Sequence, residues 1–362
     1  MKTSTRRPAL VIAGERIRAG QSRELELPFG ESYLGTPQSI PVYVIAARKS
    51  GPRVFITSTI HGDELNGLGI VRALLYEKPP KLVKGTLIFI PVVNIHGLER
   101  HTRYMPDRRD LNRCFPGSAT GSQTRRLAHA IYTEIIRQCD YGIDFHSAAV
   151  RRTNYPNVRA NTRDSGTRML AKVFGGELIV NSNGPDGSLR RTAVDAGVPT
   201  IILEAGEVWK IEPSVVEVGV RGCQNVLRAL GMLEGRPQPP SFQIIADKTV
   251  WVRSDQGGIL GFHVRPGQLV RQGEGLATVY SIFGQEQTSL ICPVDGMVLG
   301  MTTMPAVSPG GPVCNIAVIP PKNYDRIVMK MAKRSEDNLY SRAQEDLSTS
   351  IAVQDINGGS NS

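Results

Sequence analysis

The stretch "TSTIHGDELNG" (57–67) places an imidazole, His61, three positions before a carboxylate, Glu64, where an apolar run ends. Two interpretations fit this spacing. A glutamate in the first turn of a helix interacts favourably with the helix dipole, so the pair could mark only a helix start. The pair could also be half of a metal site, because imidazole and carboxylate are both donors that zinc accepts. The second interpretation requires further ligands from distant parts of the chain.

Two further groups come at the ends of apolar runs that predict strands. His146 follows "YGIDF", and Glu204 follows "VPTIIL". In α/β sheets with parallel strands, ligands gather outside the carboxyl ends of the strands. Two histidines and one glutamate form a known ligand set of hydrolytic zinc sites, in which one position stays open. Glu204 would then polarise the bound water, although His146 taken alone could be a core histidine with satisfied hydrogen bonds.

Alternating strands and helices must position these groups. Unbroken or alternating apolar runs predict strands at 53–60, 85–94, 141–148, 177–181 and 198–206. Helical spacing predicts helices from Leu65 to Leu75 and at 124–138, 166–176, 189–197 and 213–233. This order predicts an α/β domain with a mixed, mostly parallel sheet.

The character of the chain changes after "EGRPQPPS" (234–241), whose prolines indicate a linker. We therefore predict a catalytic domain at 1–235, with residues 1–40 at its periphery, and a linker at 236–244. Short strands separated by turns predict a small all-β domain at 245–320. The charged and polar end, residues 321–362, is predicted to be a flexible tail.

The all-β segment repeats itself weakly and resembles the lipoyl- and biotinyl-carrier domains, which implies a small barrel-like domain. "GGILGFHVRPG" and "DGMVLGMTTMP" both run from glycine through an apolar strand to a proline turn. Carrier domains present a modified lysine on a hairpin between the halves, but "VYSIFGQEQTSLI" contains no lysine. We therefore expect no covalently attached cofactor, and a role in shaping or covering the active-site entrance.

Composition narrows the class of protein. The 362 residues are 40% hydrophobic and 21% charged, and the longest apolar stretch is far shorter than the ~20 residues of a membrane span. Five scattered cysteines without a CxxC pair indicate reduced thiols. Because the apolar core of the N-terminal segment is too short for a signal peptide, a cytoplasmic location is expected. The net charge of +10 fits an acidic substrate, a nucleic-acid surface or a merely solubilising surface. Aromatic residues amount to only 6%, without interleaved basic residues, which argues against nucleic acid.

The motifs together resemble the succinylglutamate desuccinylase/aspartoacylase family. "HGDE" (61–64), "DLNRCFPG" (110–117), His146 and "LEAG" (203–206) occur in the family's order, and the resemblance covers roughly residues 40–235. The resemblance implies a zinc hydrolase of the M14 type, with a three-layer carboxypeptidase-like domain and a small β domain behind it.

Carried over residue by residue, the resemblance implies that His61, Glu64 and His146 bind one Zn²⁺ per chain. Glu204 becomes the general base and acid. Glu207 is its alternative, but the small residue and glycine after Glu204 match the family.

The resemblance also implies the groups that bind the substrate. Asn112 and Arg113 would clamp a substrate carboxylate, and Arg103 would stabilise the developing oxyanion, with Arg108 as its alternative. Tyr280 is a candidate substrate-binding residue from the β domain.

Two aspartates beside the predicted ligands have roles that the spacing suggests. Asp63 is expected to cap a helix. Asp144, two residues before His146, lies on the same side of its strand and could orient that imidazole or serve a structural role.

The resulting hypothesis is a zinc-dependent amidohydrolase that deacylates an N-acyl amino acid or a similar carboxylate-bearing amide. The alternative is a metallopeptidase that trims acidic residues, such as glutamates, from a peptide end. A non-catalytic metal or nucleic-acid binding protein is a weaker alternative. The expected partner is a small acidic substrate or an acidic peptide end, not a membrane, and the oligomeric state is left open, a homo-oligomer included.

Overall fold

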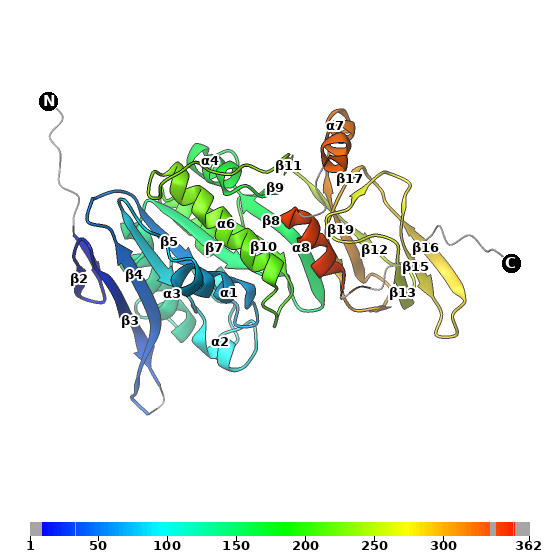
Figure 1. Ribbon diagram of the computed structural model, residues 1–362. Helices are drawn as coiled ribbons and strands as arrows, with labels where there is room; N and C mark the ends of the chain where they lie inside the picture. The colour runs from blue at the N-terminus through cyan, green and yellow to red at the C-terminus, as the bar shows by residue number, and fades with distance from the viewer. Residues whose placement is uncertain (1–8, 33, 334–337, 350, 352–362) are drawn as a thin grey trace.

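A large mixed sheet forms the centre of the molecule (Figure 1). The computed structural model describes residues 9–32, 34–333, 338–349 and 351. The 13-stranded sheet has the order β12-β19-β17-β8-β10-β7-β5-β6-β4-β3, with β9, β11 and β14 paired beside this path. Its N-terminal half consists of β3 (Ser22–Glu31), β4 (Pro37–Ala46), β5 (Arg53–Thr57), β6 (Thr86–Ile90), β7 (Tyr141–His146), β8 (Arg152–Ala160), β9 (Leu178–Asn181) and β10 (Thr200–Gly206). The run β6-β5-β7-β10 is parallel, as the sequence predicts.

Helices cover both faces of this sheet and give three layers. On one face lie α1 (Asn66–Arg72), α4 (Ser165–Phe174) and α6 (Pro213–Ala229), which Figure 1 shows in front of the strands. On the other face lie α3 (Gln123–Glu134) and α5 (Leu189–Asp195). Ile143 and Phe145 of β7 pack in the core with α6. Because side chains alternate along a strand, Asp144 and His146 point to the opposite face, the one that α3 and α5 cover.

The C-terminal strands continue the central sheet. β17 (Gly296–Thr302) pairs with β8, and β19 (Pro312–Val318) and β12 (Thr249–Arg253) follow it outward; β11 (Ile244–Ala246) and β14 (Leu269–Val270) pair with β9 and β17. A second sheet, β16-β15-β13-β18, packs on this extension and shares one core with it. Its strands are β13 (Gly258–Phe262), β15 (Gly275–Tyr280), β16 (Glu286–Ile291) and β18 (Ala306–Val307). The sequence predicts a small barrel of its own, whereas the all-β segment shares a sheet with the α/β part.

The structure corrects the prediction of a flexible tail beyond residue 320. Its described residues form α7 (Pro321–Ala332) and α8 (Leu339–Ser348). Tyr340 is buried in the main core, its hydroxyl donates to the Gly175 carbonyl over 2.9 Å, and the Arg221 guanidinium stacks on its ring. Burial of one apolar face therefore outweighs the polar composition of α8. Residues 334–337, 350 and 352–362 of the predicted tail lie outside the described residues.

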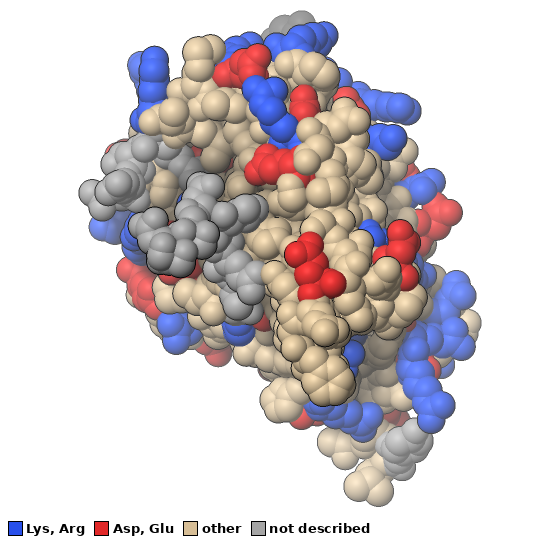
Figure 2. Space-filling model, turned by 90° about the vertical axis from the view of Figure 1, so that its right-hand side faces the viewer, with Lys and Arg blue, Asp and Glu red and all other residues tan. Residues whose placement is uncertain are grey.

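The surface, the helices and the thiols bear on three further predictions. Figure 2 shows the end of the molecule formed by the C-terminal strands, where basic and acidic side chains are interspersed around a largely uncharged centre. This face lacks the continuous basic patch, among the residues coloured there, that a nucleic-acid surface requires. None of the described helices is long and apolar enough to cross a membrane. All five cysteines are free, as predicted.

Candidate metal centre and active site

The loop after β5 carries the first two site residues in an unusual backbone conformation. Thr59 has φ +54°, which a β-branched residue rarely adopts, so the surrounding structure must hold the loop in place. At Gly62, a Cβ atom would meet the backbone of Gly97 in α2 (Ile95–Glu99) at 1.9 Å. The glycine therefore lets this loop pack directly on α2, and the loop directs His61 and Glu64 toward the end of β7.

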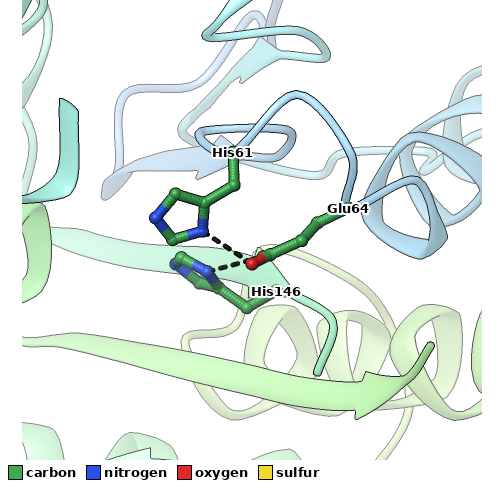
Figure 3. A group of neighbouring side chains, drawn as sticks. All are labelled: His61, Glu64 and His146. Atoms are coloured by element: carbon green, nitrogen blue, oxygen red, sulfur yellow. Dashed lines mark hydrogen bonds and ion pairs between the residues drawn. The ribbon is translucent and has the colours of Figure 1, made fainter. Parts of the chain in front are cut away.

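Three side chains converge on one point (Figure 3). The Glu64 carboxylate lies 2.6 Å from His61 Nδ1 through Oε1, and 2.9 Å from His146 Nδ1 through Oε2. Ligand atoms of the three residues all lie within 4.8 Å of one another, and all three side chains are buried. The Ser147 backbone N–H also donates to Glu64 Oε2 over 3.1 Å. The structure therefore brings together the three residues proposed as ligands.

An aspartate contacts the Nε2 atom of each histidine, on the side of the ring away from Glu64. His146 Nε2 lies 3.0 Å from Asp144 Oδ2, and Thr57 Oγ1 donates to the other oxygen of Asp144 over 2.7 Å. His61 Nε2 lies 3.2 Å from Asp110 Oδ1. These contacts direct the Nδ1 atoms of both rings toward Glu64, as outer carboxylates do for metal-binding histidines. The structure makes the Asp144 contact that the sequence suggests, whereas Asp110 was not singled out.

The cluster is strongly ionic. Burial disfavours the charged form of His146, but the Asp144 and Glu64 carboxylates outweigh it and raise the pKa of His146 to about 10. Burial likewise opposes ionisation of Glu64, yet the two imidazoliums lower the pKa of its carboxyl far below the usual range. The same carboxylates would stabilise a metal cation at this point. Because histidine binds a metal through an unprotonated ring nitrogen, metal affinity should depend on pH.

Glu204 lies beside the cluster on the neighbouring strand. β10 and β7 are parallel, and Glu204 is in register with His146, so the two side chains emerge on the same face of the sheet. Asn154 Nδ2 donates to Glu204 Oε1 over 2.8 Å, and Arg159 Nε lies 2.7 Å from Glu204 Oε2. Both partners come from β8, which the sequence did not predict as a strand.

The prediction that Asp63 caps a helix is wrong. α1 begins after Leu65, whose position has no side-chain capping hydrogen bond. Asp63 is instead buried beside Glu64, and its Oδ1 has no hydrogen-bond partner among the described residues. Burial and the charge of Glu64 raise the pKa of Asp63.

Of the two arginines considered for the oxyanion, the structure brings Arg103 to the cluster. Its Nη1 lies 3.4 Å from Glu64 Oε1, and its Nη2 lies 2.9 Å from Asp110 Oδ2. Arg108 is exposed in a turn with φ +63°, and no hydrogen bond or ion pair of the described residues joins it to the cluster.

The sequence and the fold resemble those of known proteins. The succinylglutamate desuccinylase/aspartoacylase catalytic domain matches residues 50–230. The chain belongs to this family.

Individual relatives of the family support the assignment. An N-alpha-acetyl-L-2,4-diaminobutyric acid deacetylase from Halomonas elongata is 29% identical over 67% of this chain and 74% of its own. A succinylglutamate desuccinylase/aspartoacylase from Rhodobacter sphaeroides is 26% identical, with a TM-score of 0.70 over 83% of this chain and 96% of its own. The product-bound ectoine utilization protein EutE (DoeB) from Ruegeria pomeroyi shares the fold at 24% identity, with a TM-score of 0.73 over 84% of this chain and 97% of its own.

The donor set of this family member fits a zinc ion. Two imidazole nitrogens and one carboxylate oxygen face one another, and the remaining ring nitrogens are held by carboxylates. Zinc accepts this combination of nitrogen and oxygen ligands, while magnesium and calcium prefer oxygen alone. His61, Glu64 and His146 are therefore the residues that could hold such an ion.

The predicted substrate-binding residues Asn112, Arg113 and Tyr280 have other surroundings than the metal cluster. Asn112 is buried, and its Oδ1 accepts from the Leu189 backbone N–H over 2.9 Å, which ties the "DLNR" segment to the start of α5. Arg113 is exposed, and its Nη1 donates to the Asn112 carbonyl over 2.7 Å. Tyr280 ends β15 in the second sheet, which Figure 1 shows at the other end of the molecule from β5 and β7. The clamp and the role of Tyr280 stay predictions.

A pair of arginines near Glu204 was not predicted. Arg190 of α5 is buried, its Nη1 donates to the Ser182 carbonyl over 2.8 Å, and its Nε has no partner among the described residues. Burial and the positive charge of Arg159 lower the pKa of Arg190 to about 10. The "LRR" triplet at the helix start is the sequence signal for Arg190, and it does not show which arginine turns inward; Arg159 lies in the arginine-rich stretch 151–163.

Proposed function

We propose that this chain is a zinc-dependent amidohydrolase that deacylates an N-acyl amino acid or a similar carboxylate-bearing amide. The observation that carries the proposal is the convergence of His61, Glu64 and His146, with Glu204 in register on the next strand. The family and its deacetylase relative support the same reaction class.

Different residues of the chain have different roles in such a reaction. His61, Glu64 and His146 would hold the zinc ion, which when bound would make an activated water available at neutral pH and act as a Lewis acid on the scissile carbonyl. Glu204 takes the proton from the attacking water and returns it to the leaving amine. Arg103, held by Asp110, directs its guanidinium toward the cluster and stabilises negative charge that develops on the carbonyl oxygen.

Positive charge beside Glu204 supports a substrate with a carboxylate. Arg159 and the buried Arg190 lie near one another, so Glu204 alone does not neutralise both. A guanidinium presents a planar fork of donors that matches a carboxylate. Arg113 would add a third cation if the "DLNR" segment forms the clamp.

A substrate panel tests this proposal. We expect the zinc-loaded protein to cleave N-acetyl or N-succinyl amino acids, N-acetyl-2,4-diaminobutyrate among them, with an amine assay as readout. Activity only on oligoglutamyl peptides would favour the metallopeptidase instead. No cleavage of any amide, together with zinc binding, would leave a non-catalytic metal protein.

The aspartate behind His146 gives a second test. Asp144→Asn is expected to weaken zinc binding about 10–100-fold, because the amide no longer orients the imidazole or raises its basicity. Competition with a chromophoric chelator measures this loss. Asp140→Asn is the matched control, since that carboxylate precedes the opposite end of the same strand, where Oδ2 accepts from the Arg53 backbone. Equal affinities in the two variants would contradict the role of Asp144.

A further inference from the structure

β8 lies between Glu204 and the C-terminal strands. On one side it pairs with β10, where Glu204 faces Asn157 and Gly206 faces Asn154 across a bulge. On its other side it pairs with β17, where Asn154 faces Gly300. Asn154 is thus the residue of β8 that has a partner both in β10, which carries Glu204, and in β17 of the C-terminal strands.

The Asn154 amide has a fixed orientation. A carboxylate oxygen only accepts hydrogen bonds, so the amide nitrogen must face Glu204 Oε1, which lies 2.8 Å away. The amide oxygen is thereby turned to the opposite side, toward β17. Together with the Arg159 Nε on Oε2, this bond fixes both oxygens of the Glu204 carboxylate.

Gly300 provides the space for that amide oxygen. A Cβ atom at Gly300 would lie 2.2 Å from Asn154 Oδ1 and 3.0 Å from the Thr153 carbonyl. β17 also carries a register shift between Val298 and Gly300 in its pairing with β19, whereas its pairing with β8 is regular from Gly300 to Thr302. Any side chain at position 300 would therefore push the Asn154 amide away.

We propose that Asn154 is a positioning residue for Glu204, and that the C-terminal strands set its position through Gly300. This inference rests on the proposed function, because it takes Glu204 as the base. It gives the C-terminal strands a part in catalysis that does not require any of their side chains to touch the substrate. The bond that Asn154 makes holds one carboxylate oxygen of Glu204 in place for proton transfer.

Steady-state kinetics of zinc-loaded variants test the proposal. Asn154→Ala is expected to lower kcat about 10- to 100-fold, with KM, zinc content and Tm close to those of the parent. Gly300→Ala is expected to give most of the same loss without changing any residue of the active site. Gly275→Ala is the matched control in β15, since the nearest atom to its Cβ would be a His263 carbon at 3.9 Å.

The double variant decides whether Gly300 acts through Asn154. Once Asn154 is truncated, Gly300→Ala has no amide to displace, so it should add little further loss of kcat. Losses that multiply in the double variant would overturn the coupling, and an unchanged kcat in Asn154→Ala would overturn the positioning role. Glu204→Gln, measured alongside, distinguishes a failure of the proposed function from a failure of this inference. If it retains activity, the proposed base is wrong, whereas if only Asn154→Ala retains activity, this inference alone fails.

Discussion

Glu204→Gln is expected to lower kcat by about 10²–10⁴-fold while the protein still binds one zinc ion. Glutamine keeps the size and shape of the side chain, but its amide cannot take a proton from the attacking water. Its oxygen can still accept the Asn154 bond, but its NH2 group cannot accept from Arg159 Nε, so one of the two contacts of this side chain is lost. Turnover of the best substrate in the panel and zinc content measured on the same preparation give the result.

Glu207→Gln is the matched control for that substitution. Glu207 lies three residues further along the chain and forms an ion pair with Lys210 over 3.2 Å. It was the alternative candidate for the base, so the two variants decide between them. Full activity in Glu204→Gln with a large loss in Glu207→Gln would move the base to Glu207.

His146→Ala is expected to abolish both zinc binding and activity at zinc concentrations that saturate the parent protein. It removes one of three ligands, so the loss of affinity should exceed the 10–100-fold typical of an outer partner such as Asp144. The cavity, and the loss of the His146 contact of the buried Glu64 and Asp144 carboxylates, should also destabilise the fold. Equilibrium dialysis with zinc, with circular dichroism as a check of folding, measures the effect.

His129→Ala provides the comparison for His146→Ala. His129 is half-buried on α3 and is not among the residues that converge on Glu64. Its removal should leave zinc binding and turnover unchanged. Zinc binding retained by His146→Ala would remove the basis of the proposed centre.

Much of the metal cluster was predictable because its geometry is local or follows from sheet topology. His61 and Glu64 are three residues apart, and His146 ends a strand parallel to β5, so the carboxyl-end rule brings them together. The contact between Asp144 and His146 follows from the two-residue period of a strand. Asp110 escaped this reasoning because its position depends on how the long segment between α2 and α3 folds back onto His61.

β8 and α8 were not predicted from the sequence, because their structure depends on packing against segments that are distant in the chain. β8 contains Asn154, Pro156, Asn157 and Arg159, so it lacks the unbroken apolar run of its neighbours. It is nevertheless a strand because it pairs with β10 and β17 and its polar side chains hold Glu204. In α8, Leu339, Ala343 and Leu347 follow helical spacing, a signal that the polar composition obscured.

Crystals of the zinc-loaded protein, measured above and below the zinc absorption edge, test the central claim most directly. We expect one anomalous peak per chain, about 2.0–2.2 Å from His61 Nδ1, His146 Nδ1 and a Glu64 oxygen. A strong peak on other residues, or full zinc occupancy with any of these three side chains turned away, would contradict it.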